Sequence, residues 1–204
     1  MIILNNDRKY LSKFEKNLIK NSLNNFEILA FPTDTTYGIG VNGSSKKAVS
    51  KIYKLKRRDD TKPLILLTYS KNELLKYIKY PELLDNEIVK KYWPGPLTII
   101  FEIKNNINLY YSKEEINTLG IRIPNNPLML DLLEFIQLPL VTTSANLSRE
   151  NPLYDGYEIE KKLNYKNHKI SIIIEDGVIK NNPSTIISLG KDKIVTLRKS
   201  NLII

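Results

Sequence analysis

Hydroxyl groups and one carboxylate crowd into FPTDTTYGIG, residues 31–40, between a short apolar run and two glycines. Thr33, Thr35 and Thr36 offer donors and acceptors to a small polar ligand, while Gly38 and Gly40 permit tight backbone turns. The other interpretation of this pattern is a turn that hydrogen-bonds only to itself.

A basic cluster occupies KLKRRDDTKP, residues 54–63. Lys56 and Arg58 stand two positions apart where a helix is expected to end, so both can turn toward one anion. A guanidinium suits phosphate because it donates two parallel hydrogen bonds. Basic side chains at the carboxyl end of a helix can also simply stabilise its dipole. The pattern therefore indicates either phosphate binding or helix capping.

An arginine interrupts the apolar segment LGIRI, residues 119–123. Burying an unpaired guanidinium is costly, so Arg122 should meet an anion. That anion is either a carboxylate of the protein or the carboxylate or phosphate of a ligand. Thr118, four residues earlier, could face the same cavity.

A second hydroxyl-rich loop, VTTSANLS at 141–148, follows another apolar run. Ser144 and Asn146 can contact a nucleotide through side chain and amide, helped by Thr142 and Thr143. A nucleophilic serine would need a nearby base and a GxSxG-like turn; this loop has neither, which argues against a serine hydrolase. The chain also contains no GxxxxGK[ST], so a bound nucleotide is not held by a P-loop of that pattern.

Helix and strand patterns alternate from end to end and must position these loops. Strands are predicted over 27–31, 63–68, 97–103, 119–123, 138–143, 171–176, 184–189 and 193–198. Helices are predicted over 11–23, from Ser44 or Ser45 to about Lys56, after a capping box of Ser70 and Glu73, over 82–92 and 127–136, and after Asp155. We expect an α/β fold with a twisted, open, mixed sheet flanked by helices, its last strands antiparallel because their connections are short. In such sheets ligands collect where strands end in polar loops.

Composition narrows the classes of function. A chain of 204 residues, 42% hydrophobic, predicts one domain over 1–204. The absence of cysteine excludes disulfides and thiolate chemistry, and the single histidine, His168, cannot build a histidine-rich metal centre. No apolar run approaches the roughly 18 residues of a membrane helix, and the amino terminus lacks a signal-peptide pattern. We therefore expect a cytoplasmic chain without membrane association.

The formal charge of +9 favours nucleic-acid binding or reflects a general richness in lysine on solvated surfaces. Dense clustering occurs only over 54–58.

Taken in order, the motifs closely resemble the YrdC-like family, in its short bacterial threonylcarbamoyl-AMP synthase form. The resemblance rests on FPTDTTYGIG, the K-x-R element at 56–58, KPLILL, WPGPLTIIF, GIRIPNNP, the S-x-N element of TTSANLS, and NPSTIISL. It implies a YrdC-like fold with a basic concave cavity. It also implies condensation of L-threonine, bicarbonate and ATP into threonylcarbamoyl-AMP and diphosphate, for threonylcarbamoyladenosine (t6A) modification at position 37 of tRNA.

The resemblance also implies roles for individual residues. Lys56 and Arg58 would contact the ATP phosphates and act electrostatically in catalysis. The L-threonine site would contain Thr33, Arg122 and Ser184, and the remainder of the ATP site would contain Thr118, Thr142, Ser144, Asn146 and Arg198. Mg²⁺ is expected to accompany ATP, with no protein side chain identified as a metal ligand. The expected partners are downstream threonylcarbamoyl-transferase proteins and, as a candidate, tRNA itself.

Two departures from the family pattern stand out. Leu67 occupies the position where some members have a threonine-binding histidine, and Arg198-Lys199-Ser200 replaces the usual Arg-Pro-Gly. An alternative is a YrdC-like paralogue that binds RNA without making the adenylate, for which the sequence argument is the positive charge. A carbamoyl-transferring relative in metalloenzyme maturation is a third possibility, although such activities usually occur in longer chains.

Overall fold

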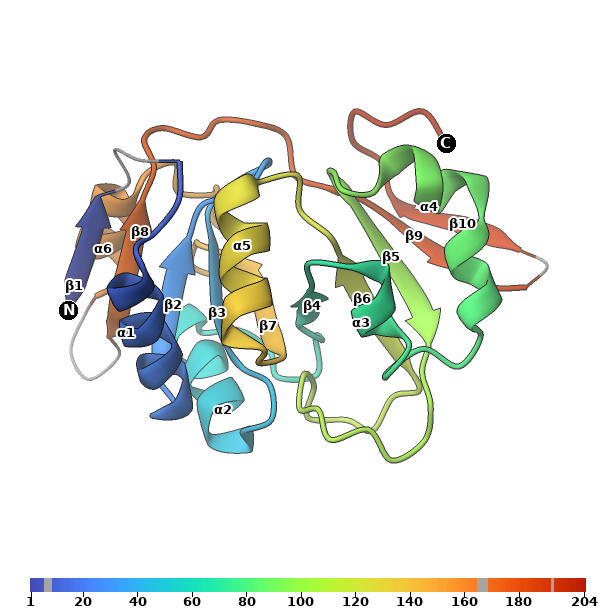
Figure 1. The fold of residues 1–204 in the computed structure, drawn as a ribbon, viewed down its shortest axis with the longest axis horizontal. Coiled ribbons are helices and arrows are strands. Elements are labelled where there is room, and N and C mark those ends of the chain that lie inside the picture. Colours follow the sequence, from blue (N-terminus) through green and yellow to red (C-terminus); the bar gives the residue numbers. More distant parts are fainter. Residues whose placement is uncertain (6–8, 165–168, 192) are drawn as a thin grey trace.

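The computed structural model describes residues 1–5, 9–164, 169–191 and 193–204 (Figure 1). Within these residues the strands are β1 (Ile2–Asn5), β2 (Ile28–Phe31), β3 (Gly38–Asn42), β4 (Ile65–Leu67), β5 (Leu97–Glu102), β6 (Thr118–Arg122), β7 (Leu140–Ser144), β8 (Ile170–Glu175), β9 (Thr185–Leu189) and β10 (Ile194–Arg198). The helices are α1 (Lys13–Asn24), α2 (Lys46–Lys56), α3 (Lys71–Leu74), the 3₁₀ helix η1 (Pro81–Asp85), α4 (Glu87–Tyr92), α5 (Pro127–Ile136) and α6 (Gly156–Leu163). His168 lies outside the described residues.

The strands form one mixed sheet in the order β1-β8-β2-β3-β7-β4-β6-β5-β9-β10. Neighbours β1–β8, β8–β2, β4–β6 and β5–β9 are parallel, and the other pairs are antiparallel. The end strands are steeply inclined to one another in Figure 1, which is the accumulated twist of a wide open sheet. The predicted α/β fold with a twisted mixed sheet is confirmed.

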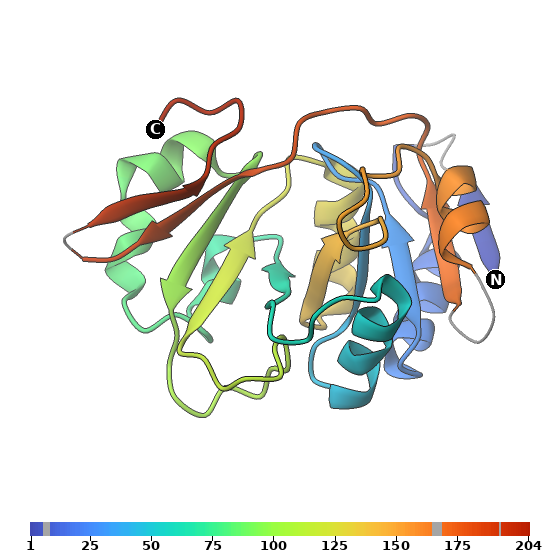
Figure 2. The same ribbon diagram turned by 180° about the vertical axis from the view of Figure 1, so that it is seen from behind.

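Each face of the sheet is covered by its own helices, because successive strand residues point to opposite sides. On one face, Leu29 and Phe31 of β2 pack in a core with residues of α1 and α5, which lie in front of the sheet in Figure 1. On the other face, Ile28 and Ala30 pack in a second core with residues of α2 and α6, which come to the front in Figure 2. The two cores hold the central strands rigidly between layers.

Helix α1 starts later than predicted, because Ser12 caps it. The Ser12 hydroxyl accepts a hydrogen bond from the Glu15 amide at 3.3 Å, and the Glu15 carboxylate accepts one from the Ser12 amide at 2.7 Å. Ile19 and Leu23 form the buried stripe of this helix, whereas Phe14 of the predicted pattern is 77% exposed. The caps predicted for the helices beginning after Ser45, Ser70 and Asp155 are present.

The helix predicted over 82–92 is interrupted. Asn86 has extended backbone angles, and its side chain accepts a hydrogen bond from the Ile88 amide at 2.9 Å, which ends η1 and begins α4. No helix within the described part of the chain is both long and apolar enough to cross a membrane.

Gly38 and Gly40 are not the turn residues that the sequence suggested. Both lie inside strand β3, paired with β2 on one side and β7 on the other. A Cβ atom on Gly38 would lie 2.8 Å from the Phe31 ring, and one on Gly40 would lie 2.9 Å from the Thr142 methyl group. These glycines therefore make room for side chains on the neighbouring strands.

The last three predicted strands are not consecutive in the sheet. β9 and β10 form the expected antiparallel pair, but β8 is inserted between β1 and β2 at the opposite end. Residues 176–184 connect them by running across the molecule, as the orange-red segment at the top of Figures 1 and 2 shows. The short connection between β8 and β9 predicted a hairpin. Instead β8 pairs in parallel with β1 and β2, which are both rich in isoleucine and leucine.

The crowding at β3 predicts a stability loss on replacing Gly40 with Ala. We expect the free energy of unfolding to fall by roughly 1–3 kcal/mol, because the added methyl group overpacks the β2–β3–β7 core. Urea denaturation of the two proteins measures this difference. Gly190→Ala is the matched control, since its Cβ would meet nothing nearer than 3.6 Å; equal losses in both variants would contradict the packing explanation.

Candidate active site

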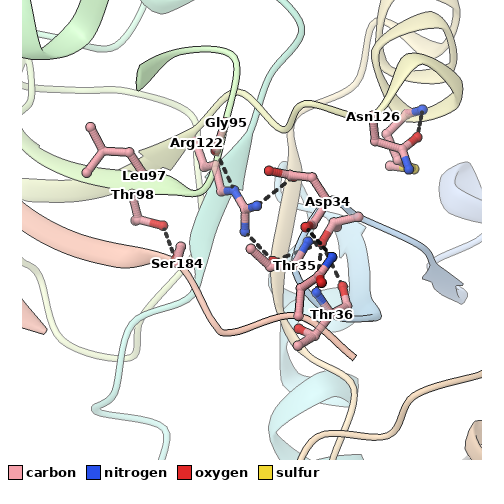
Figure 3. Close-up of polar contacts among 12 residues, drawn as sticks. Asp34, Thr35, Thr36, Gly95, Leu97, Thr98, Arg122, Asn126 and Ser184 are labelled. Carbon is pink, nitrogen blue, oxygen red and sulfur yellow. Dashed lines mark hydrogen bonds and ion pairs between the residues drawn. The ribbon is translucent and has the colours of Figure 1, made fainter. Parts of the chain in front are cut away.

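The predicted residues fall into two groups at the ends of the central strands. We call Asp34, Thr35, Arg122, Ser184 and Arg198 the arginine cluster (Figure 3 shows all but Arg198). We call the second group the lysine cavity, a hollow of about 500 Å³ lined by Lys56, Arg57, Arg58, Asp59, Lys62, Ser144, Asn146, Ser148 and Arg149. The loop between β2 and β3, which carries Asp34 and Thr35, adjoins the lysine cavity, because Gly38 pairs with Ser144 and the Ala145 amide donates to the Tyr37 carbonyl at 2.9 Å.

Thr33 holds the turn that follows β2. Its hydroxyl accepts hydrogen bonds from the amides of Thr35 and Thr36 at 3.1 and 3.3 Å, and donates to the Thr36 carbonyl at 2.6 Å. The hydroxyl groups of Thr33 and Thr35 also lie 3.0 Å apart. The hydrogen-bonded turn that the sequence allowed is therefore present, and it fixes the position of Asp34 and Thr35.

Arg122 is buried at the end of β6 and meets the anion that its burial requires. Its Nη2 donates to Asp34 Oδ1 at 2.6 Å, its Nη1 to Thr35 Oγ1 at 2.8 Å and its Nε to the Gly95 carbonyl at 3.1 Å. The two charged side chains are only 6% and 13% exposed. Of the five N–H groups of a guanidinium, these bonds leave one on each terminal nitrogen. Arg122 can therefore form its ion pair with Asp34 and still donate two hydrogen bonds to a ligand.

Ser184 and Arg198 are held together beside Arg122. The Arg198 guanidinium donates to the Ser184 carbonyl through Nε at 3.0 Å and Nη2 at 2.8 Å, and Nη2 also reaches the Ser184 hydroxyl at 3.1 Å. The hydroxyl groups of Ser184 and Thr98 lie 2.8 Å apart. Burial is the main cause that lowers the pKa of Arg122, and the charge of Arg198 lowers it further. Two guanidinium groups therefore repel each other here.

Lys56 is the most deeply buried cation of the site, at 1% exposure. Its Nζ donates to three oxygens of the loop after β7, namely the Ser144 carbonyl at 2.5 Å, the Asn146 carbonyl at 2.7 Å and Asn146 Oδ1 at 2.8 Å. The Lys56 carbonyl in turn accepts from the Ser148 amide at 3.0 Å. Because an ammonium group has three donors, these bonds use its full capacity. The predicted partners Lys56, Ser144 and Asn146 form one network.

Burial is the main cause that lowers the pKa of Lys56, and the nearby Arg58 guanidinium lowers it further, to about 7. The three acceptors around Nζ oppose this effect, because only the ammonium form can donate to all of them. An anion bound in the lysine cavity would also stabilise the charged form.

Arg57, Lys62 and Arg149 are the exposed cations of the lysine cavity, and Arg58 is half-buried. The hydrogen bonds of the Arg58 side chain to described residues are long, to the Lys62 carbonyl at 3.4 Å and the Pro63 carbonyl at 3.3 Å. The lining comprises five cationic side chains and one carboxylate, Asp59. Such an imbalance favours a ligand with several negative charges.

The pairing of β4, β6 and β7 shows on which face of the sheet Thr118 and Thr142 lie relative to Arg122. Leu67 pairs with Arg122 across β4–β6, and Ile65, two residues earlier, pairs with Thr142 across β4–β7. Since residues two apart point to the same face, Thr142, Arg122 and Thr118 share one face of the sheet. Leu67 itself is buried in the core under α1 and α5.

Sequence reasoning missed several polar residues. Asp34 lay within a quoted motif, and the requirement of Arg122 for an anion was the signal that could have found it. Lys62 directly precedes the strand of KPLILL, and Thr98 opens β5 as a polar residue in an apolar run. Ser148 and Arg149 carried no comparable signal, since their position depends on how the loop folds back over α2.

Comparison with known proteins agrees with this arrangement. The family model for Sua5, YciO and YrdC, described as telomere recombination, matches residues 21–200. A protein of Methanocaldococcus jannaschii is 39% identical over 194 residues, covering 95% of this chain and 87% of the relative. The threonylcarbamoyl-AMP synthase of Klebsiella pneumoniae is 34% identical over 139 residues, covering 67% of this chain and 73% of the relative.

Among solved structures, Sua5 of P. abyssi complexed with L-threonine superposes with a TM-score of 0.84 at 28% identity. The match covers 97% of this chain but 57% of that one, so this chain spans little more than half the length of that Sua5. The chain belongs to the Sua5, YciO and YrdC family.

The buried position of Lys56 predicts a specific pH dependence of stability. Its pKa is about 7 in the folded protein and 10.5 ordinarily, so between these values the unfolded chain binds more protons. The free energy of unfolding should therefore rise with pH in this interval, by at most ~1.4 kcal/mol per pH unit. In urea denaturation at pH 7, 8 and 9, the free energy of unfolding of wild type should rise relative to that of Lys56→Met at each step. Lys54 is an exposed residue of the same helix, so Lys54→Met should show the same change in the free energy of unfolding with pH as wild type. The same pH dependence in Lys56→Met as in wild type would contradict the prediction.

Proposed function

We propose that this chain is an L-threonylcarbamoyladenylate synthase, which converts L-threonine, bicarbonate and ATP into threonylcarbamoyl-AMP and diphosphate. The observation that carries the proposal is the juxtaposition of the arginine cluster and the lysine cavity at the ends of β3 and β7. One offers guanidinium groups to an amino-acid carboxylate, and the other offers several cations to a polyphosphate. The family relationship and the name of the K. pneumoniae relative support the same activity.

The chemistry explains why so much positive charge is needed. The amine of threonine first attacks the carbon of bicarbonate: a C–N bond forms, a C–O bond of bicarbonate breaks and the oxygen leaves as water, which gives a carbamate anion. A carbamate oxygen then attacks the α-phosphorus of ATP, and diphosphate leaves. Attack of one anion on another is unfavourable in water, so the site must neutralise charge and align the reactants. A nucleophilic or general-base residue is not required, in keeping with a site built from cations, hydroxyls and amides.

On the nucleotide side, Arg58 has donors available for the phosphates because its contacts within the protein are long. Ser144, Asn146, Thr118 and Thr142 hold the adenylate portion in this proposal. Lys56 contributes its charge to the cavity floor and fixes the Ser144–Asn146 loop, since its three donors are already engaged. Lys56 therefore supports catalysis in two ways: its charge acts on the phosphates, and its hydrogen bonds fix the loop that holds the nucleotide.

On the amino-acid side, the two remaining N–H groups of Arg122 bind the threonine carboxylate while Asp34 keeps the guanidinium oriented. In this proposal Thr33 and Ser184 complete the threonine site, and Arg198, which donates to the carbonyl and hydroxyl oxygens of Ser184, contacts the nucleotide. The proposal does not need the histidine found in some relatives, because Leu67 packs into the core.

Mg²⁺ belongs to the substrate in this proposal. The residues present do not fit a protein-held metal centre: within the described residues no group of three or more His, Cys, Asp or Glu side chains is placed to hold a metal ion. Mg²⁺ would arrive bound to ATP, held by phosphate oxygens and water, which is its usual preference.

The product would serve t6A modification of tRNA position 37 in the cytoplasm, through threonylcarbamoyl-transferase proteins that accept the adenylate. Direct contact with tRNA is part of this proposal and draws on the +9 charge.

The proposed reaction predicts a strict dependence on three substrates. Purified protein should release diphosphate from ATP only when L-threonine and bicarbonate are both supplied, measured by a coupled diphosphate assay. Omission of either substrate is the control. Turnover that ignores threonine would reject the proposal, while RNA binding with steep salt dependence and no turnover would favour the RNA-binding paralogue.

Removing the half-buried guanidinium of Arg58 should slow the reaction. We expect Arg58→Ala to cost roughly 2–4 kcal/mol of transition-state stabilisation, because charge develops on the phosphates as diphosphate leaves. The measurement is kcat/KM for ATP. Lys54→Ala removes a cation from the last turn of helix α2, outside the lysine cavity, and should retain wild-type activity; an unchanged rate for Arg58→Ala would exclude Arg58 from the site.

A further inference from the structure

The turn formed by Ser148 and Arg149 borders the lysine cavity next to the end of α2, where the Ser148 amide donates to the Lys56 carbonyl. Both residues line the cavity together with Arg58 and Lys62. Neither was assigned a role by the sequence or by the chemistry discussed so far. Their side chains nevertheless have properties that point toward a bound anion.

Ser148 carries a buried hydroxyl group without a hydrogen-bond partner among the described residues. Its backbone is well fixed, because its amide donates to the Lys56 carbonyl at 3.0 Å. Leaving a buried polar group unsatisfied is costly, and such groups are rare in folded proteins. An acceptor oxygen in the cavity, such as that of a phosphate, would satisfy this hydroxyl.

Arg149 adopts a backbone conformation that ordinary residues avoid. Its φ of 72° lies in the left-handed region, where a residue with a side chain is strained. The strain persists because the turn is anchored on both sides: Asn146 Nδ2 donates to the Glu150 carbonyl at 2.6 Å, and the Glu150 amide donates to the Leu147 carbonyl at 3.1 Å. Among the described residues the Arg149 guanidinium has no carboxylate within ion-pair distance. An unpaired cation thus stands at the mouth of a cavity that is already rich in cations.

The side chains that line the cavity differ in their exposure to solvent. Lys56 and Asn146 are buried at its floor, whereas Arg57, Lys62 and Arg149 are exposed and Arg58 is half-buried. Four cations that are at least partly exposed around one cavity match a group with several negative charges better than a monophosphate.

We propose that Ser148 and Arg149 form a second phosphate-binding element, which binds the β- and γ-phosphates of ATP, the part that leaves as diphosphate. This inference rests on the proposed function for the identity of the nucleotide. Ser148 donates its hydroxyl hydrogen to a phosphate oxygen. Arg149 offers its guanidinium fork to the same phosphates, in the cavity that Arg58 also lines.

Inorganic diphosphate and AMP serve as probes in calorimetric titrations of the full chain. Arg149→Gly should weaken diphosphate binding roughly tenfold or more, the size expected from loss of a charge-assisted hydrogen bond, and leave AMP binding unchanged. Arg149→Lys should recover part of the affinity. Ser148→Ala should weaken diphosphate binding by a smaller factor, roughly threefold to tenfold.

The glycine variant separates binding from folding. Since glycine accepts a φ of 72° without strain, Arg149→Gly should not lower the urea midpoint. Asn106→Gly, at another position of positive φ, controls for backbone effects, and Lys191→Ala controls for net charge; both should bind diphosphate like wild type.

Unchanged diphosphate affinity in Arg149→Gly would overturn the proposal, as would equal losses for AMP and diphosphate. The binding measurement needs neither threonine nor turnover. A chain that fails the three-substrate assay but shows selective loss in Arg149→Gly would refute the synthase activity and retain the phosphate site.

Discussion

A single buried ammonium group joins the two layers from which the site is made. Lys56 ends helix α2 on one face of the sheet, and its three hydrogen bonds hold the loop that follows the central strand β7. The Ser148 amide returns to the Lys56 carbonyl, so the loop is fastened to the same residue twice. The positions of Ser144, Asn146, Ser148 and Arg149 all follow from this attachment. Burial in the folded chain lowers the pKa of Lys56, and the acceptors of the loop compensate for that cost.

The arginine cluster follows a different electrostatic principle. Arg122 and Arg198 are close enough to affect one another. Among the described residues Asp34 is the carboxylate that pairs with Arg122, whereas Arg198 contacts neutral oxygens of Ser184. The positive charge of this region is therefore only partly balanced by the protein. A ligand carboxylate or phosphate would complete the balance, which is why the cluster and the lysine cavity together suit two anionic reactants.

The sequence was most informative where local chemistry decides the outcome. The caps at Ser45, Ser70 and Asp155 and the polar loops after β2 and β7 were predicted, since side-chain type and spacing alone determine them. The strand containing Gly38 and Gly40 was missed, because its glycines are required by contacts with Phe31 and Thr142 that only the folded sheet creates. The prediction that Arg122 meets an anion was correct, but its partner Asp34 could not be identified because it lies 88 residues away in the sequence. Likewise, nothing local shows that Lys56 would be enclosed by acceptors 88 and 90 residues further along the chain.

The long crossing between β8 and β9 has a consequence for how the protein is made. Residues 170–198 supply strands at both ends of the sheet, β8 between β1 and β2, and β9 beside β5. During synthesis β1 therefore lacks its neighbour β8, and β5 keeps an open edge, until residues 170–198 have been made. Such edges invite mispairing. A truncation before residue 170 would remove strands from both ends of the sheet at once.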